Sequence, residues 1–568
     1  MSVFARRIFS FPVFLGVLLI SGVFFGARVE GSRGDLLFSE GDMWWHLRAG
    51  EDILETHAFP QRDTYAATAR GTDWIAYEWL GEVGIAAVFR AGQLSGLKCL
   101  DLGLACVLLL LLFGHALQRS HNSKAAFIAC AVFLPVFLGF CTMRPQLFGW
   151  IFFLLTLIAV ESFERGNNRA VWYLPPIFLL WVNTHGTFVL GLLALTLAWA
   201  GAYLQFERNG IFAERWDPAR RRTFAMATLA CFAVLPITPY GTRLSAYPLE
   251  LAIAQPTNVA NIQEWLPLST ERFLSAAVLI LLATFFLSVI FGGAKCRVSE
   301  GALVLLCAFG SAIHLRFVIL FVFVAVPFFA VGIRRAVPIY NAERDHPVWN
   351  AALILLVLAG CARSFPSQAQ LHRALTGHYP VGALQSARSI PLREPLFNDY
   401  GWGGYLIWRG ALMQGVFVDG RADVHERAGT LSDYLRLARL EPGAFDVIEK
   451  YNLQSFLIRR DSALATALGA SADWERTYVD NLAVIFVRRN RSHVSAQHEG
   501  MEALKVASCS DSLQMKHNGT RFLIGAETNG LCPTLVQGAQ HSPASSLFMS
   551  KVSGPVLAMR VHGHTPGQ

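Results

Sequence analysis

The chain has 568 residues, of which 54% are hydrophobic, and its mean hydropathy is +0.41. A water-soluble domain is seldom so apolar, so the composition predicts a polytopic membrane protein with a smaller water-soluble part. The formal net charge of +8 does not indicate nucleic-acid binding, because Lys and Arg lie mostly in short connections between apolar segments, where they set orientation in the membrane.

The first apolar segment, residues 8–29, is long enough to cross a bilayer. Arg6 and Arg7 precede it, and the positive-inside rule therefore places the N-terminus in the cytoplasm. A cleaved signal peptide is the alternative, but the apolar stretch is longer than a usual signal core and no small-x-small cleavage site follows. The pattern favours a retained helix.

Apolar runs along the chain predict an α-helical polytopic membrane protein with about eleven transmembrane helices. The boundary between the fifth and sixth is the least distinct, because they meet at 181–186. The expected spans are 8–29, 99–117, 125–142, 146–163, 171–185, 187–205, 223–238, 273–292, 300–314, 317–333 and 348–363.

The distribution of basic residues supports an alternating path with the N-terminus inside. Every connection that this path places inside is basic, whereas the short outside connections are poorer in charge. The same alternation places everything after Arg363 outside. The inside connections contain Arg119 and Lys124; Arg165 and Arg169; Arg208, Arg215, Arg220, Arg221 and Arg222; Lys295 and Arg297; and Arg334, Arg335 and Arg344.

Two outside connections are long, namely 30–98 and 238–270. The first contains amphipathic patterns near 42–56 and 74–91, whose tryptophans are typical of helices lying in the membrane interface. Residues 1–363 are therefore predicted to form the transmembrane domain.

Residues 364–490 have the composition of a water-soluble α/β domain, which the alternation places outside the membrane. Strands are expected at 416–418 and 455–458, helices at 430–440 and 443–451, and a hairpin at 475–479 and 483–488. The tail 491–568 is rich in Ser, Gly, His and Pro and is typical of disorder. The ten cysteines form no C-x-x-C motif, and the pattern leaves open whether Cys509 and Cys532 pair.

The most distinctive run follows the first apolar segment and has the sequence EGDMWWHLR from Glu40 to Arg48. Asp42 emerges on the outer side at the membrane surface, where its carboxylate is well placed to act as a general base. The alternative is a carboxylate that caps the following helix, with Trp44 and Trp45 as interfacial anchors.

A second acidic candidate is Glu78, in the sequence Tyr77-Glu78-Trp79, with Glu82 one helical turn later. Glu78 could orient an acceptor or help Asp42 to hold a divalent cation. A solvated helix face is the alternative. No cofactor is required by the pattern; if Mg²⁺ or Mn²⁺ takes part, Asp42 and Glu78 are the expected ligands.

Outward-facing cations near helix ends could stabilise a leaving phosphate. Arg144 and Arg316 lie within or beside apolar runs, where a charge costs roughly 2.5–3.5 kcal/mol, although snorkelling to the interface is an alternative role. The phosphate-binding candidates are His46, Arg48, Arg144, His185 and Arg316.

The expected acceptor- or sugar-binding residues combine aromatic rings with polar groups, because aromatic faces suit sugar rings. Structural roles are the alternative, since Asp-Gly turns are common. These candidates are Trp44, Trp45, Tyr77, Glu264, Trp402, Tyr405, Asp419 and Arg421.

Over residues 8–490 these features resemble the C-type superfamily of membrane glycosyltransferases, which includes protein O-mannosyltransferases, aminoarabinose transferases and oligosaccharyltransferase catalytic subunits. More narrowly, the chain is similar to uncharacterised bacterial members of this type. Their pattern Asp-x-Trp-Trp-His-Leu-Arg-x-Gly is matched at 42–50, and Tyr/His-Glu-Trp-Leu at 77–80. Trp-Gly-Gly-Tyr-Leu and Asp-Gly-Arg-x-Asp are matched at 402–406 and 419–423.

The resemblance implies that Asp42 occupies the position of the catalytic carboxylate and that the donor is a polyprenyl-phosphate-linked sugar. It also implies a bacterial inner-membrane protein whose C-terminal domain is periplasmic, with membrane lipids as partners and a glycolipid, a polysaccharide or a protein as acceptor. The Trp-Trp-Asp motif that binds the acceptor sequon in oligosaccharyltransferases is absent. Two other functions remain open: a transporter or flippase for a lipid-linked saccharide, and a non-catalytic assembly protein for envelope polysaccharide.

Overall fold

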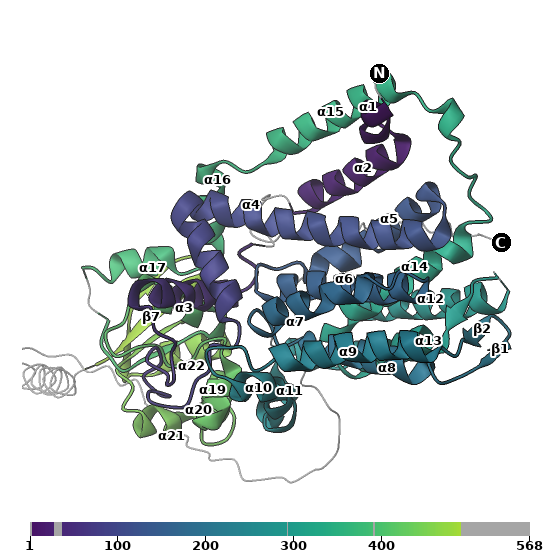
Figure 1. Cartoon of the computed structure of the whole chain (residues 1–568). Helices are drawn as coiled ribbons and strands as arrows, with labels where there is room; N and C mark the ends of the chain where they lie inside the picture. The colour runs from purple at the N-terminus through teal and green to yellow at the C-terminus, as the bar shows by residue number, and fades with distance from the viewer. Residues whose placement is uncertain (1–2, 28–36, 292, 390–391, 490–568) are drawn as a thin grey trace, which may run out of the picture.

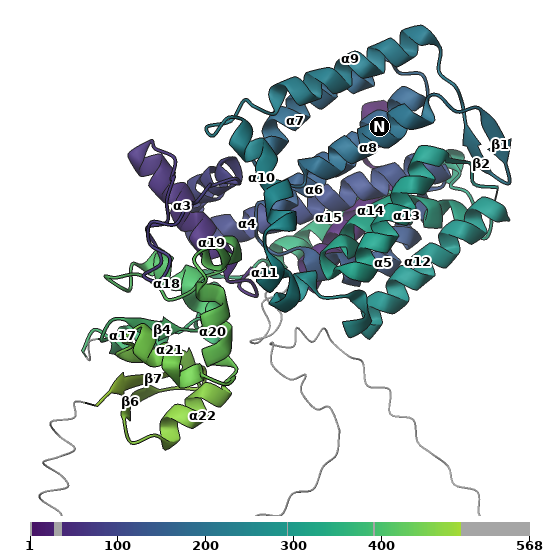
Figure 2. The same ribbon diagram turned by 90° about the horizontal axis from the view of Figure 1, so that it is seen from below.

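The computed structural model describes residues 3–27, 37–291, 293–389 and 392–489 (Figure 1). Long helices lie side by side in a bundle, with a four-stranded sheet and its helices at one end and a small hairpin at the other (Figures 1 and 2). The predicted tail, with Cys509 and Cys532, lies outside the described residues.

The described part of the chain is mostly helical, as the sequence predicts, and six of its helices are long and apolar enough to cross a membrane. Four further apolar helices are shorter, and α9 (Pro218–Val234) begins in a basic turn. The six are α4 (Trp79–Ser120), α5 (Ser123–Phe140), α6 (Gln146–Glu164), α12 (Arg272–Ile290), η4–α14 (Leu315–Ile333) and α15 (Pro347–Ser364). The four are α2 (Phe11–Gly26), η1–α7 (Ala170–Val182), α8 (Phe188–Gly201) and α13 (Val298–Ile313).

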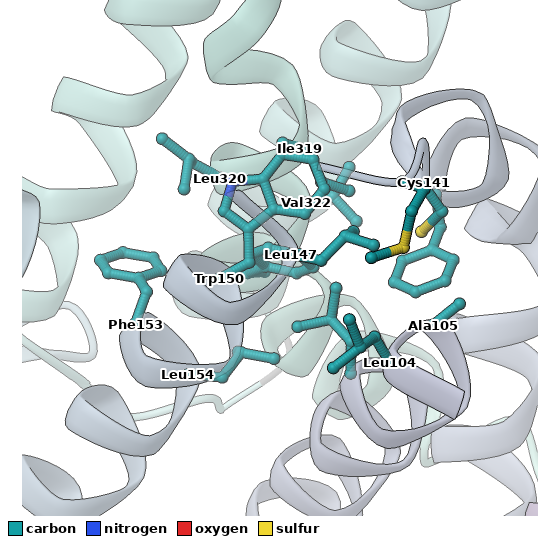
Figure 3. Close-up of a cluster of buried hydrophobic side chains, with 14 of the residues drawn as sticks. Leu104, Ala105, Cys141, Leu147, Trp150, Phe153, Leu154, Ile319, Leu320 and Val322 are labelled. Atoms are coloured by element: carbon teal, nitrogen blue, oxygen red, sulfur yellow. The ribbon is translucent and has the colours of Figure 1, made fainter. Parts of the chain in front are cut away.

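The centre of the bundle is a cluster of buried apolar side chains, to which α4, α6 and α14 contribute (Figure 3). α14 (Val318–Ile333) is apolar along its whole length and nearly all of it is buried, as expected for a helix surrounded by others. Elsewhere the bundle exposes large apolar side chains, which is typical of a surface that contacts membrane lipid. Examples are Leu279, Ile280, Leu287, Phe309, Leu355 and Leu356.

The first long connection forms two helices. The predicted helix at 42–56 is α3 (Asp42–Thr56). Most of the amphipathic pattern at 74–91 and the whole span at 99–117 lie in α4. As predicted, they are two helices, which meet at a kink at Gln93, where φ is 51°. The second long connection contains α10 (Thr242–Ile253), α11 (Pro256–Asn261) and the short 3₁₀ turns η2 (Gln263–Trp265) and η3 (Leu268–Thr270).

The four-stranded sheet has the order β4 (Leu396–Asn398), β5 (Ser455–Arg459), β7 (Ala483–Arg488), β6 (Trp474–Val479). β4 and β5 are parallel, and β6–β7 is the predicted hairpin. The helices of this region are α16 (Gln368–His378), α17 (Val381–Ser386), α18 (Gly403–Arg409), α19 (Ala422–Arg427), α20 (Thr430–Ala438), α21 (Ala444–Lys450) and α22 (Ala463–Ala470). α20, α21 and β5 lie where the sequence predicts them.

The strand predicted at 416–418 is wrong. Val416 makes only an isolated bridge to Ala66: its N–H donates to the carbonyl of Tyr65 at 3.1 Å, and it accepts from the N–H of Ala67 at 2.8 Å. The extended segment therefore pairs with the first long connection instead of entering the sheet.

A second, smaller sheet lies at the opposite end of the bundle. Its order is β1 (Phe206–Arg208), β2 (Ile211–Ala213), β3 (Cys296–Arg297). Asn209 and Gly210 both have positive φ, which is the backbone that a two-residue hairpin turn requires.

Candidate active site

Asp42 is the first residue of α3 and faces a single arginine from the α5–α6 connection. Nη1 of Arg144 lies 3.4 Å from Oδ2 of Asp42, and its Nη2 lies 2.7 Å from Oε1 of Glu264 on η2. Glu40 pairs with the same Nη2. Three carboxylates from two connections therefore share one guanidinium, and the side chain of Asp42 keeps about 19% of its surface exposed.

A chain of buried acids and imidazoles lies beside this cluster. Nδ1 of His46 is 3.0 Å from Oε1 of Glu82, and its Nε2 is 3.4 Å from Oε2 of Glu78. The other oxygen of Glu78 is 3.2 Å from Nε2 of His185. The N–H of Thr187 donates to Nδ1 of His185 at 3.2 Å, so Nε2 of His185 carries the proton and donates to Glu78. The contacts form a continuous path of close imidazole–carboxylate pairs from Glu82 to His185.

Close packing of α3 on α4 creates the first part of this path. A β-carbon added to Gly50 would lie 2.1 Å from the carbonyl oxygen of Glu82, so only glycine permits this approach. His46 is one turn before Gly50 on the same face of α3 and therefore reaches both Glu78 and Glu82.

The α7–α8 connection supplies the last part of the path. Leu80 N–H donates to the carbonyl of Asn183 at 3.0 Å, and the indole of Trp79 donates to the Asn183 side chain at 2.8 Å. These bonds fix the connection against the start of α4 and place His185 on Glu78.

The α13–α14 connection contributes Arg316. Its guanidinium lies 4.2 Å from the centre of the Trp265 ring, and no ion pair to it occurs among the described residues. Leu315 N–H donates to the carbonyl of Leu266 at 2.9 Å, which holds the Glu264 segment beside Arg316. An arginine without a carboxylate partner is suited to binding a phosphate.

Burial favours the neutral forms of most acids and imidazoles in the cluster. At Glu264 burial is outweighed by the charges of Arg144 and Arg316, which lower its pKa. Burial raises the pKa of Asp42 to about 7; the charge of Arg144 opposes this, and Glu40 and Glu264 add to it. Burial also raises the pKa of Glu78 well above its usual range and lowers the pKa of His185 to about 3. Burial and the charge of Arg144 lower the pKa of His46. Burial therefore disfavours the charged forms of Glu78, His46 and His185.

Of the predicted site residues, several meet here and others do not. Tyr77 lies at the edge of the cluster, with its ring 5.1 Å from that of Tyr247, and the ring of Trp45 lies 3.6 Å from that of His46. Arg48 instead pairs with Asp52 at 2.8 Å on the exposed face of α3. The structure brings together Asp42, Glu78, His46, Arg144, His185, Arg316, Glu264, Tyr77 and Trp45.

Five predicted sugar-binding residues lie in the protein interior. Trp44 packs against Tyr379, Tyr405 and Trp408, and the indole of Trp402 donates to the carbonyl of His378 at 3.0 Å. A side chain without exposed surface offers no face to a sugar, so this role is not retained for them. The five are Trp44, Trp402, Tyr405, Asp419 and Arg421, which are at most 2% exposed.

The structure adds two carboxylates to the predicted set, Glu40 and Glu82. Glu82 follows Glu78 by four residues, the spacing that places two side chains on the same face of a helix, and this signal is present in the sequence. The approach of Glu40 to Arg144 depends on tertiary structure.

One group in the cluster has the donors that a metal ion requires. His46, Glu78 and Glu82 each offer one ligand atom, and these atoms lie within 4.8 Å of one another. Oε2 of Glu82 is buried and has no hydrogen-bond partner. A set of one imidazole and two carboxylates fits Mn²⁺ better than Mg²⁺, which prefers oxygen ligands. Asp42, the other predicted ligand, is not in this group.

Comparisons with known proteins give a similarity in fold. No family model and no curated protein matches the chain. An Archaeoglobus fulgidus oligosaccharyltransferase tethered to an acceptor peptide with the NVT sequon has a TM-score of 0.47 and 12% identity, over 86% of this chain and 75% of that one. The oligosaccharyltransferase AglB from the same organism, in complex with an inhibitory peptide and a dolichol-phosphate, has a TM-score of 0.42 and 12% identity, over 79% of this chain and 69% of that one. ArnT from Cupriavidus metallidurans bound to undecaprenyl phosphate has a TM-score of 0.42 and 13% identity, over 84% of this chain and 97% of that one. None of these similarities assigns a function to this chain.

Proposed function

We propose that the chain is an integral membrane glycosyltransferase that moves a sugar from a polyprenyl-phosphate donor to an acceptor, with Asp42 as the general base. One observation carries the proposal. Every second connection of the predicted helical path contributes a side chain to the Asp42 cluster. In order along the chain these are Asp42 and Glu78, Arg144, His185, Glu264 and Arg316.

This convergence follows from the topology that we propose. Consecutive antiparallel helices bring alternate connections to the same side of a bilayer. The proposed path uses the six long apolar helices together with α2, α7, α8, α9 and α13, which gives eleven crossings. Under the positive-inside rule the cluster and the region after Arg363 lie on the periplasmic side of a bacterial inner membrane.

The proposed reaction is an inverting transfer. A hydroxyl of the acceptor attacks the anomeric carbon, its proton passes to Asp42, and the polyprenyl phosphate leaves with the electrons of the broken bond. The phosphate leaves as an anion and needs no acid, so one carboxylate is sufficient as base. Arg316 and Arg144 would bind the developing phosphate charge, and His46 and His185 would position Glu78.

The raised pKa of Asp42 supports the role of base. A general base works best when its pKa lies near the working pH, and burial brings Asp42 to about 7. Tyr77 and Glu264 lie at the edge of the same cluster, and we assign them to the acceptor side.

A divalent cation would be held by His46, Glu78 and Glu82. When bound, it would supply positive charge for the donor phosphate. In that state these residues would release their protons, and Asp42 would remain the group that accepts the proton of the acceptor.

Transport of a lipid-linked saccharide is less well supported. A transport path requires polar groups across the membrane, but α4 contains no charged residue from Leu102 to Gly114, a length of about 20 Å at 1.5 Å per residue. The corresponding part of the bundle is the apolar cluster of Figure 3.

The test is a transfer assay with the full chain in proteoliposomes, using a panel of radiolabelled polyprenyl-phosphate sugars and a membrane extract of lipids and proteins as acceptor. We expect transfer by the wild type and by D73N, an exposed first-connection aspartate, but not by D42N with normal folding. Full activity of D42N would exclude Asp42 as base. Absence of transfer from every donor would contradict the enzyme class.

A further inference from the structure

The Asp-Gly-Arg turn at 419–421 packs directly against the carboxylate of Asp42. A β-carbon added to Gly420 would lie 1.6 Å from Oδ1 of Asp42 and 3.1 Å from Nε1 of Trp45. The φ of Gly420 is not in the left-handed region, so the requirement for glycine is one of space and not of backbone conformation. The backbone of this turn therefore packs directly against the side chain of Asp42 on one side.

A second turn of the same region holds the backbone beside Asp42. A β-carbon on Gly404 would lie 2.6 Å from the carbonyl oxygen of Gly41, and one on Gly41 would lie 2.4 Å from that of Gly401. The start of α3 is thus enclosed by two backbone segments that are more than 350 residues away in the sequence.

Arg421 fixes the 419–421 turn to the first long connection. Its Nε and Nη2 donate to the two oxygens of Asp419 at 2.8 and 2.7 Å, and its Nη1 donates to Asp63 at 2.5 Å. The guanidinium also lies 4.9 Å from the ring centre of Tyr65 and 4.7 Å from that of Trp74. Buried and bonded on both sides, it leaves the turn little freedom to move away from Asp42.

The next residues join the same turn to the second long connection. The hydroxyl of Tyr247 on α10 donates to Asp423, and the two oxygens of Glu426 accept from the N–H groups of Thr257 and Asn258 at 2.8 and 2.7 Å. Glu264 lies a few residues further along this connection. One segment therefore fixes both connections that carry carboxylates of the cluster.

We propose that Gly420 and Arg421 are positioning residues, which hold the carboxylate of Asp42 in its reactive place through the packing of the 419–421 turn. This inference rests on the proposed function. It replaces the contact with sugar that the sequence predicts for Arg421 and Asp419. Neither Gly420 nor Arg421 touches substrate; they act through Asp42.

The substitution G420A tests the proposal, because the atom that must give way is the end of the Asp42 side chain and not a backbone atom. Displacement of a catalytic group by about 1 Å lowers turnover by about 100-fold. We expect kcat to fall by about that factor while KM for the lipid-linked donor changes by less than about 3-fold. The matched control is G469A in α22 of the same region, where an added β-carbon meets only Phe486 at 3.9 Å.

A comparison of melting temperatures separates this proposal from the proposed function. G420A should lower Tm in the wild-type background but not in D42A, where the overlapping atoms are absent. An unchanged kcat in G420A, or an equal fall of Tm in both backgrounds, would overturn the proposal. If the wild type transfers no sugar, the proposed function fails, and the Tm comparison still decides whether the turn acts on Asp42.

Discussion

The two ends of the helical bundle both bury glutamates, arginines and histidine, but they balance their charges differently. At the end far from Asp42, three glutamates each have an arginine: Arg119 forms two bonds with Glu300 at 2.6 and 3.1 Å, Arg165 binds Glu161 at 2.7 Å, and Arg297 binds Glu164 at 2.9 Å. His115 also bonds Glu161 at 2.8 Å. Residues of this ion network line part of a pocket of about 50 Å³.

At the Asp42 end the acids exceed the bases. Glu40, Asp42 and Glu264 share Arg144, while Glu78 and Glu82 have only imidazole partners among the bonds described here. A fully paired network stabilises one structure, whereas excess buried carboxylates raise pKa values and leave sites for a proton or a cation. We therefore expect the paired end to have a structural role and the Asp42 end to carry the proposed reaction.

The largest expected effect of a substitution at the Asp42 end is a loss of activity. D42N should reduce kcat by about 1,000-fold or more, within the range for loss of a general base. Its Tm should instead rise at about pH 8. The folded pKa of Asp42, about 7, exceeds the unfolded value of 3.8, so ionisation destabilises the fold as pH rises between them. Thermal unfolding of both proteins in detergent checks this. A lower Tm in D42N at that pH would contradict the account.

Removal of a bound metal should be the next largest effect. Chelation should reduce transfer by about 10- to 100-fold, the loss typical when a metal centre is weakened, and Mn²⁺ should restore activity better than Mg²⁺. The metal content of purified E82Q, measured by mass spectrometry, should fall. E300Q at the other end should retain its metal. Equal metal content in wild type and E82Q would contradict the assignment of His46, Glu78 and Glu82.

Arginine substitutions at the two ends of the bundle should reduce stability by different amounts. R119A removes both guanidinium bonds of the half-buried Glu300, which among the described residues keeps only the bond from the N–H of Arg297. Removal of one partner of a buried ion pair typically costs about 3–5 kcal/mol. R144Q should cost less, because Asp42, whose pKa is already raised, can take up a proton in its place. Urea or thermal unfolding of both variants provides the measurement. A larger loss in R144Q than in R119A would reverse the distinction between the two ends.

The smallest expected effect is a shift in pH dependence. Glu40 raises the pKa of Asp42, so E40Q should move the rising limb of the rate profile to lower pH. E207Q serves as the control, because Glu207 is an exposed residue of β1 that pairs with Lys295 at the far end. A shift of the E40Q limb to higher pH would show that the charge of Glu40 does not act on Asp42.

Local patterns in the sequence predict the elements, but the site depends on contacts between distant segments. The helix at 42–56 follows from its own amphipathic pattern. Asp42 and Glu78 stand out as acids in the long first outside connection, whereas Arg144 and Arg316 stand out because charge beside apolar runs is costly. The segment at 416–418 has the composition of a strand, yet its hydrogen-bond partner is Tyr65 in the first connection. Composition cannot identify such a partner.

The motif at 419–423 illustrates the same limit. Its residues suggested contact with a sugar, whereas the structure buries Arg421 between Asp419 and Asp63 and places Gly420 on Asp42. Aspartate, glycine and arginine serve either role, and only the neighbouring segments distinguish them.

The role of Asp42 as base is best tested by the pH dependence of kcat/KM for sugar transfer in proteoliposomes. We expect the rate to rise with pH with a midpoint near 7, because Asp42 must lose its proton to act as base and its pKa is about 7. D42N should lack this limb in its residual activity. A wild-type rate that is independent of pH across this range, or a limb that persists unchanged in D42N, would contradict the claim that the unbalanced charges prepare Asp42 for catalysis.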